Sequence, residues 1–362
     1  MRHPENEAQY KGLKVNKGVA DVLSVNPYFK KISRQRPYTS SEFVEGILGG
    51  DIAILSQAVT LIESAREEHQ RQAQEIIEQC LPHSGRSVRI GITGVPGAGK
   101  STAIDVLGMY QVQKGYRLAV LAIDPSSERS KGSILGDKTR MEALSREKNA
   151  FIRPSPTAGS LGGVARKTRE TIVLCEAAGF DTIFVETVGV GQSETAVHSM
   201  VDFFLLIQLA GTGDELQGIK RGIMEMADGI VINKADGDNI DRAKLAASHF
   251  RNALHLFPPA DSGWEPQVLT CSGYYNLGIE ELWQMMNGYI AFTKANGYFE
   301  HKRNEQSRYW MYESIRDLLR NAFYHHPEIE HLLPRMEQKV LHNELSSFVA
   351  AKQMIDRFME KQ

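Results

Sequence analysis

Two patterns of apolar residues alternate along the chain. From Tyr38 to about Leu81 apolar residues recur at helical spacing, and Thr39 with Glu42 fits a capping box before the first predicted helix. From 86 to 287 the pattern changes to short, almost wholly apolar runs, most of them followed by a helical stretch. These runs are Val88–Thr93, Leu118–Asp124, Phe151–Arg153, Thr182–Glu186, Phe203–Leu209, Ile230–Asn233 and Val268–Cys271. Because strands that are apolar on both faces belong to sheets covered by helices, the pattern predicts an α/β fold, a doubly wound and mostly parallel sheet.

The helical pattern returns in the last fifth of the chain. Its apolar stripe is made by Met311, Ile315, Leu318, Leu319 and Ala322. His325-His326-Pro327 ends that helix, and a further helix is expected over Ser347–Phe358. We predict three parts: a helical extension (1–85), an α/β nucleotide-binding domain (86–290) and a helical arm (291–362). The arm either packs back on the core or serves dimerisation, because a short terminal pair of helices has little core of its own.

Composition narrows the choice of partners. The chain of 362 residues holds 42 Lys and Arg against 44 Asp and Glu, a formal net charge of −2, so no strong field attracts nucleic acid or anionic lipid. No apolar run approaches the ~20 residues that a membrane span needs, and the first residues lack the apolar core of a signal peptide. The three widely spaced cysteines fit reduced core positions. We therefore expect a cytoplasmic protein that binds neither nucleic acid nor membrane.

A phosphate-binding loop follows the first predicted strand. It reads Gly94, Val95, Pro96, Gly97, Ala98, Gly99, Lys100, Ser101 and Thr102, which is G-x-x-x-x-G-K-S, and a helical stretch comes next. The glycines let successive backbone N–H groups point at phosphates, and the helix N-terminus adds positive potential. Lys100 is expected to reach the β- and γ-phosphates, and the Ser101 hydroxyl to bind Mg²⁺.

An N-K-x-D sequence at the end of a later strand predicts guanine as the base. The carboxylate of Asp236 can accept from both N1–H and the exocyclic amine of guanine, whereas adenine offers no such pair of donors. Asn233 is expected on the other side of the base and the Lys234 stem over its face. The small loop at the end of the next strand is expected to offer a backbone N–H to the guanine carbonyl; its residues are Ser272, Gly273 and Tyr274. These features predict GTP or GDP as ligand.

Three acidic residues are candidates for the magnesium ion and for catalysis. Asp124 and Glu186 each end a predicted strand, and Asp137 follows in a loop rich in small residues. The carboxyl ends of parallel strands meet at one edge of a sheet, which brings such side chains to the nucleotide. Each acid alone is also compatible with a helix cap or a solvated turn. Taken together we expect Asp124, Asp137 and Glu186, with Ser101, to form the metal site.

A loop after the fifth predicted strand has two possible roles. In Leu209–Lys220, Gly211, Thr212 and Gly213 come directly after the strand end, which fits either a plain surface turn or an additional switch that reports nucleotide state. Val190 stands where many GTPases have a water-positioning glutamine, and Gln192 comes two residues later. We expect slow hydrolysis by the free protein, with Lys220 supplying a catalytic cation when a partner orders the loop.

These segments resemble a known family. GVPGAGKST, AIDPSS, GSILGDKTRM, FIRP, ETVGVGQSE, AGTGDELQGIK and VINKAD, in this order, are similar to the metallochaperone-type P-loop GTPases associated with methylmalonyl-CoA mutase. That group includes the methylmalonic aciduria type A protein, and some members are labelled arginine/ornithine transport kinases. The resemblance implies a homodimeric, Mg²⁺-dependent GTPase that protects and loads an adenosylcobalamin-dependent acyl-CoA mutase. It also implies Lys100, Ser101, Asp124, Asp137 and Glu186 as metal and catalytic positions. Lys131 departs from the glycine expected before Gly132.

Two alternatives stay open. A metabolic kinase would transfer the γ-phosphoryl group to a small acceptor or a transport component, but the chain shows helical extensions instead of a dedicated acceptor domain. A nickel-insertion GTPase would carry a His-rich tail or paired cysteines, whereas the eleven histidines are scattered and His325-His326 is the sole adjacent pair. The sequence therefore favours the chaperone.

Overall fold

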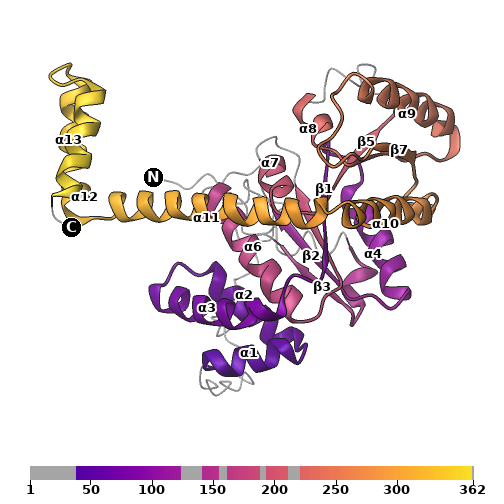
Figure 1. Ribbon diagram of the computed structural model, residues 1–362, viewed down its shortest axis with the longest axis horizontal. Helices are drawn as coiled ribbons and strands as arrows, with labels where there is room; N and C mark the ends of the chain where they lie inside the picture. The colour runs from indigo at the N-terminus through magenta and orange to yellow at the C-terminus, as the bar shows by residue number, and fades with distance from the viewer. Residues whose placement is uncertain (1–37, 124–140, 155–160, 188–192, 211–220, 361–362) are drawn as a thin grey trace, which may run out of the picture. The chain divides into compact units, whose positions relative to one another are not determined.

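Seven strands form one sheet in the order β3-β2-β4-β1-β5-β6-β7 (Figure 1). The computed structural model describes residues 38–123, 141–154, 161–187, 193–210 and 221–360, and every element below belongs to the unit Ser40–Gln362. The strands are β1 (Val88–Gly94), β2 (Leu118–Ile123), β3 (Ala150–Arg153), β4 (Thr182–Thr187), β5 (Phe203–Leu209), β6 (Gly229–Asn233) and β7 (Gln267–Thr270). Every neighbouring pair is parallel. The predicted doubly wound sheet is therefore confirmed.

The strand order reverses direction at β1. After β1 the chain builds β2, β3 and β4 on one side and then β5, β6 and β7 on the other. In open α/β sheets, ligands bind beyond the carboxyl ends of the strands at such a reversal point. The loop that follows β1 is the phosphate-binding loop, so the topology places it at the position where a nucleotide is expected.

The two faces of the sheet bury different partners. On β1, Ile90 and Ile92 belong to a core cluster with side chains of α4 (Lys100–Gln113) and α10 (Ile279–Ala295). Gly91, between them, points the other way, because successive strand residues alternate between faces. A Cβ atom on Gly91 would lie 2.9 Å from the side chain of Val197 on α7 (Ser193–His198) and 2.7 Å from that of Phe204. Gly91 thus permits a close approach of α7 to the sheet.

The remaining helices lie between the strands and at both ends of the described chain. They are α1 (Ser40–Leu48), α2 (Ile52–Glu63), α3 (Glu67–Cys80), α6 (Leu161–Ala177), α8 (Arg221–Glu225), α9 (Ile240–Leu254), α11 (Tyr298–Tyr324), α12 (Pro327–Leu341) and α13 (Ser347–Met359). Asp51 caps α2 by accepting from the backbone N–H groups of Ala53 (2.8 Å) and Ile54 (3.1 Å). Helices α1, α2 and α3 pack on one another and on α6.

The helix break predicted at His325-His326-Pro327 is confirmed. Helix α11 ends at Tyr324, and Pro327 occupies the first position of α12, where its missing N–H costs no hydrogen bond. Helices α12 and α13 enclose a small apolar cluster of their own, made by Ile329, Met336, Ala350, Met354 and Phe358. None of the described helices is long and apolar enough to cross a membrane.

Candidate nucleotide-binding site

Backbone geometry makes glycine necessary in the phosphate loop. A Cβ atom on Gly94 would lie 2.1 Å from the carbonyl oxygen of Ile207 on β5, so the loop leaves β1 in close contact with its neighbour. Gly97 and Gly99 have φ angles of 78° and 82°, in the left-handed region that favours glycine. A Cβ atom on Gly99 would also lie 2.7 Å from Nδ2 of Asn233. The glycine spacing in the sequence therefore follows from the path of the loop.

Lys100 begins helix α4 and is only 9% exposed. Its ammonium donates to the carbonyl oxygens of Gly94 (2.9 Å) and Val95 (3.3 Å), both in the first part of the loop. The side chain thus folds back across the loop and places a positive charge inside its curve. This is the position from which a lysine compensates the charge of the β- and γ-phosphates.

Two oxygen ligands suited to magnesium lie beside the loop. Ser101 Oγ donates to Glu186 Oε1 at 3.3 Å, and Glu186 is 8% exposed near the end of β4. Mg²⁺ prefers hydroxyl and carboxylate oxygens, takes few of them from protein, and completes its shell with water and phosphate oxygens. The pair therefore fits this ion, although the described residues contain no cluster of three or more His, Cys, Asp or Glu that would hold a metal alone.

A buried pair of threonines joins the two strands that carry these groups. Thr187 Oγ1 donates to Thr93 Oγ1 at 2.8 Å, between the ends of β4 and β1. Sequence reasoning missed this contact, although Thr93 ends one predicted strand and Thr187 directly follows another. The bond fixes the end of β4, and with it Glu186, relative to the strand that leads into the phosphate loop.

Asn233 connects the base side of the site to the phosphate loop. Its Nδ2 donates to Ala98 O at 2.7 Å, and its Oδ1 accepts from the backbone N–H of Gly273 at 3.2 Å. Burial raises the pKa of the Cys271 thiol to about 12, so the neutral thiol also donates to Asn233 Oδ1, at 3.4 Å. Asn233 is 2% exposed. It therefore holds three segments together, a role that the N-K-x-D pattern alone did not indicate.

Asp236 is oriented by Ser272. The buried Ser272 hydroxyl donates to Asp236 Oδ2 at 2.5 Å and accepts from the backbone N–H of Tyr275 at 3.2 Å. Lys234, between Asn233 and Asp236 in the sequence, adopts a φ of 59°. Because the N–H of Gly273 is bonded to Asn233, the N–H of Tyr274 remains the candidate in this loop for the predicted contact with the guanine carbonyl.

The structure brings together the predicted loop residues, Ser101, Glu186, Asn233, Asp236 and Ser272. Asp124, Asp137 and Lys220 lie outside the described residues, as do Val190 and Gln192. The roles predicted for them stay predictions.

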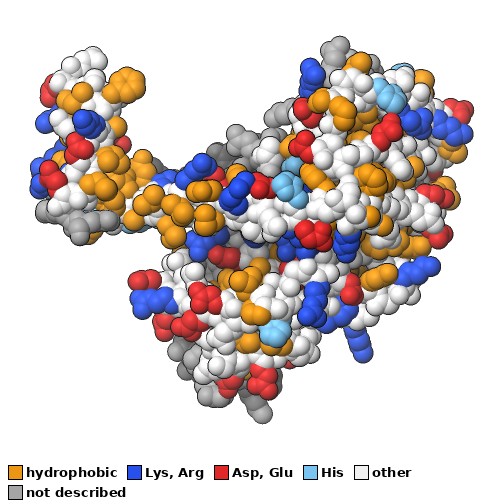
Figure 2. All heavy atoms as spheres, in the orientation of Figure 1, with side chains coloured by type: hydrophobic (Ala, Val, Ile, Leu, Met, Phe, Trp, Pro, Cys, Tyr) orange, Lys and Arg blue, Asp and Glu red, His pale blue; other side chains and the backbone are white. Residues whose placement is uncertain are grey.

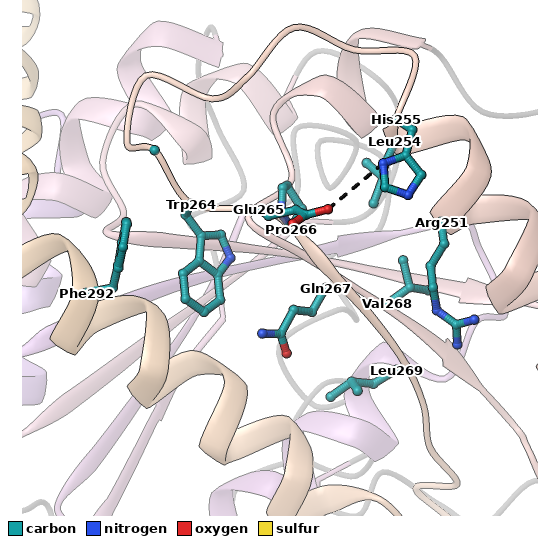
Figure 3. A pocket seen from close by; sticks show the side chains of 11 residues that line it. Arg251, Leu254, His255, Trp264, Glu265, Pro266, Gln267, Val268, Leu269 and Phe292 are labelled. Atoms are coloured by element: carbon teal, nitrogen blue, oxygen red, sulfur yellow. Dashed lines mark ion pairs between the residues drawn. The ribbon is translucent and has the colours of Figure 1, made fainter.

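A separate pocket of about 500 Å³ lies at the outer edge of β7, between α9 and α10 (Figure 3). Trp264 and Phe292 form one wall, and His255 faces Glu265 with 4.0 Å between Nδ1 and Oε1. None of the predicted nucleotide-binding residues lines it. Phosphate loops bind their ligand mainly through backbone N–H groups at the carboxyl edge of a sheet, so we assign the nucleotide to the loop and not to this pocket.

Comparisons with known proteins agree with this assignment. The sequence model of the family described as methylmalonyl Co-A mutase-associated GTPase MeaB matches residues 55–328. The chain is 49% identical over 310 residues to a probable GTPase of Mycobacterium tuberculosis, covering 86% of this chain and 92% of the relative. It is 45% identical over 326 residues to the mitochondrial methylmalonic aciduria type A homolog of Mus musculus, covering 87% and 79%. The crystal structure of an LAO/AO transport system kinase superposes with a TM-score of 0.70 at 36% identity, covering 88% of this chain and 97% of that one.

Proposed function

This chain belongs to the methylmalonyl-CoA mutase-associated GTPase family, and we propose that its GTP hydrolysis gates the loading and protection of an adenosylcobalamin-dependent acyl-CoA mutase. The chain is a P-loop GTPase, which converts GTP to GDP and phosphate. The observation that supports the guanine nucleotide most directly is the Asp236 carboxylate aligned by Ser272, because a carboxylate can accept from both guanine donors. The Asn233 bridge joins this base loop to the phosphate loop. The mutase of the methylmalonyl-CoA type is the partner that the family description suggests.

Each part of the site has a role in this proposal. The loop N–H groups and Lys100 bind the β- and γ-phosphates, and the Asp236 carboxylate, aligned by Ser272, accepts from guanine. Ser101 and Glu186 would hold Mg²⁺, and the ion would neutralise charge that develops on the phosphate oxygens. We propose Asp124 and Asp137 as further metal and catalytic residues on the basis of the resemblance.

Hydrolysis in this family requires positioning more than covalent chemistry. The γ-phosphoryl group passes to water through a loose transition state, so the protein contributes mainly orientation and charge. The described part of the site supplies one buried cation, Lys100. We propose that Lys220 supplies a second when the partner enzyme binds, which would couple hydrolysis to docking.

We propose that the chain forms a homodimer through its C-terminal arm, residues 291–362. The distal half of α11 exposes large apolar side chains, as Figure 2 shows; they are Met311, Tyr312, Ile315, Leu318 and Leu319, each 44–59% exposed. An apolar face of this kind is typical of a protein interface. We also propose the division into residues 1–85, 86–290 and 291–362. Helix α10 runs through residue 290, and Phe299 beyond it is buried in the core, so the arm and the sheet domain share part of that core.

The dimer has a direct test. Replacing both Leu318 and Leu319 with Glu should shift the mass measured by analytical ultracentrifugation from dimer to monomer. Leu256→Glu is the matched control, because Leu256 is 81% exposed but lies after α9. A dimer that persists in the double variant, or a monomeric wild type, would contradict the proposed interface.

The mutase partnership is tested by GTP turnover with and without a purified adenosylcobalamin-dependent methylmalonyl-CoA mutase. We expect the mutase to accelerate hydrolysis and to retain cofactor better when GTP is present. An acyl-CoA enzyme that uses no cobalamin serves as control. Equal turnover in all three mixtures, together with no binding in a pull-down of the two purified proteins, would reject the mutase as partner.

The kinase alternative rests on the similarity to the LAO/AO transport system kinase. Incubation with γ-labelled GTP and arginine separates the two proposals. Label that appears in phosphoarginine would support the kinase, whereas label released only as phosphate supports the GTPase chaperone.

We also place the protein in the cytoplasm, supported by three buried cysteines without disulfides, Cys80, Cys175 and Cys271.

A further inference from the structure

Helix α11 is attached to the turn that follows α7. Residues 199–202 form this turn, called here the α7–β5 turn. Lys302 Nζ donates to the carbonyl oxygen of Asp202 at 2.8 Å. Arg303 donates to both carboxylate oxygens of Asp202, at 2.8 and 2.7 Å, and Asp202 is 2% exposed. Such a bidentate pair has a defined geometry, so this end of α11 is fixed on the turn.

Two further side chains continue the attachment along the same helix. Gln306 Nε2 donates to Val201 O at 2.8 Å, and Trp310 Nε1 donates to Ser199 O at 3.0 Å. Residues spaced by three or four positions lie on one face of a helix, so α11 reaches the turn at successive positions. These two carbonyl groups lie one and three residues after the end of α7. Their donors therefore determine where the C-terminal end of α7 lies.

The same turn is joined to β1, the strand that leads into the phosphate loop. The backbone N–H of Asp202 donates to Arg89 O at 2.8 Å, and the N–H of Arg89 donates to Asp202 Oδ2 at 2.8 Å. A Cβ atom on Gly91 would lie 2.9 Å from the side chains of both Val197 and Val201. Helix α7 and its turn therefore lie directly on β1, with α11 on their other side.

Helix α6 holds Gln306 and Trp310, the two residues that donate to the α7–β5 turn. Arg169 Nη1 donates to Gln306 O at 2.9 Å, and the guanidinium lies 5.4 Å from the centre of the Trp310 ring. Gln306 and Trp310 are each 7% exposed. Gln306 Oε1 is buried without a hydrogen-bond partner among the described residues. A buried amide with only one of its two ends hydrogen-bonded costs free energy. The hydrogen bond that Gln306 Nε2 donates to the turn therefore indicates a role beyond packing.

We propose that Gln306 and Trp310 are positioning residues for GTP hydrolysis, acting on α7 through the α7–β5 turn. Helix α7 has six residues, and its first residue, Ser193, comes directly after Gln192 in the sequence. A short helix moves as one body, so fixing its last residues also fixes the first ones relative to β1 and the phosphates. The inference rests on GTP hydrolysis by this site and not on which enzyme is the partner.

The coupling is reciprocal, because two sites linked by one element affect each other by the same factor. A nucleotide that shifts α7 changes the contacts of Gln306 and Trp310, and both belong to the helix whose distal half carries the exposed apolar stripe. The state of the nucleotide would therefore reach α11 without any contact between α11 and the nucleotide.

The first test compares three variants. Trp310→Phe keeps the ring but removes the indole N–H, Gln306→Met removes the amide at similar volume, and Trp283→Phe is the control on α10. We expect Trp310→Phe and Gln306→Met to lower GTP turnover, and to shift the ratio of affinities for a non-hydrolysable GTP analogue and GDP about fivefold or more. The control should leave both quantities unchanged. A merely structural role would lower thermal stability and weaken both nucleotides alike, which would overturn the proposal.

The second test leaves the junction intact and does not depend on whether these variants fold. The chain has three tryptophans, so Trp264→Phe combined with Trp283→Phe makes Trp310 the sole indole. We expect its fluorescence emission to differ between the GDP complex and the complex with the non-hydrolysable analogue. Identical spectra in the two complexes would show that the nucleotide does not reach this contact and would overturn the proposal.

Discussion

Asn233 Nδ2 donates a hydrogen bond of 2.7 Å to the carbonyl oxygen of Ala98, so one buried side chain ties the end of β6 to the phosphate loop. The same side chain accepts from the N–H of Gly273 in the loop after β7. The base half and the phosphate half of the site are therefore positioned by a common group. A change at Asn233 should therefore affect both halves of the site.

We expect Asn233→Ala to weaken GTP and GDP by the same factor. It leaves Ala98 O and the Gly273 N–H unsatisfied, which should lower the free energy of unfolding by about 1–3 kcal/mol. Asn296→Ala is the control, because Asn296 Nδ2 makes a comparable bond to Ser262 O (2.9 Å) away from the site. Isothermal titration and urea unfolding measure the two effects. Lower stability with unchanged nucleotide affinity would contradict the role of the bridge.

Asp236→Asn should change the base preference. The amide presents a donor to the donors of guanine, so GTP affinity should fall by about 2 kcal/mol or more, which is over tenfold. Xanthosine triphosphate, with a carbonyl at that edge, should bind this variant better than GTP does. Ser272→Ala is the comparison, since it removes the bond that orients Asp236 and should weaken GTP without favouring xanthosine. Unchanged GTP affinity in titrations of Asp236→Asn would remove Asp236 from the base site.

Binding and chemistry should separate at Lys100 and Glu186. Lys100→Ala removes the charge inside the loop and should reduce both GTP affinity and turnover, each by about tenfold or more. Glu186→Gln should reduce turnover more than GDP affinity and raise the Mg²⁺ concentration needed for half-maximal turnover. Steady-state turnover across a Mg²⁺ series measures the difference. Equal losses of GDP affinity and turnover in the Glu186 variant would argue against a metal role.

Lys220→Ala should reduce the partner-stimulated rate far more than the basal rate. A cation that enters the site in the transition state contributes about 10³–10⁵ in rate in related GTPases. The measurement is GTP turnover of wild type and variant, each with and without the mutase, and Arg221→Ala provides a neighbouring control. Full stimulation of the Lys220 variant, or fast hydrolysis by the wild type alone, would show that the residue has no such role.

Acid should destabilise the protein through His198. Burial, and next the charge of Lys302, lower the pKa of His198 from 6.5 to about 4. The unfolded chain therefore binds the proton first, so the stability present above pH 6.5 is lost as the pH falls toward 4. The shift corresponds to about 3 kcal/mol. The free energy of unfolding should therefore fall less between pH 7 and pH 4.5 in His198→Phe than in the wild type, because the variant lacks the contribution of His198. The same pH dependence in the variant would contradict the assignment.

Strand positions and the phosphate loop could be predicted from the sequence because each depends on local patterning. Ile183, Phe184 and Val185 in the middle of β4 are all buried, so this part of the strand is apolar on both faces and stands out from its surroundings. The glycines at 94, 97 and 99 are required by backbone geometry, which sequence spacing reports directly. The helix break at Pro327 has the same origin in local chemistry.

Contacts between distant segments were not predictable. Arg303 and Gln306 are polar residues in a helix, a pattern that normally indicates a solvent-facing surface, yet both bind a turn about 100 residues earlier in the sequence. No periodicity records which polar side chain meets which carbonyl group. The Asn233 bridge could not be predicted for the same reason, since it depends on how three loops meet at the sheet edge.

Gly91 has a consequence for how this gene can vary. In the sequence it looks like one more small residue within an apolar strand, and its φ angle is not among the left-handed ones. Its side of β1, however, leaves no room for a single carbon atom against Val197, Val201 and Phe204. Every missense change at a glycine codon introduces a Cβ atom, so even alanine would force α7 away from the sheet. We therefore expect the encoded glycine to be nearly invariant among functional copies of the gene, and a saturation library selected for GTPase function to return almost only synonymous changes at this codon.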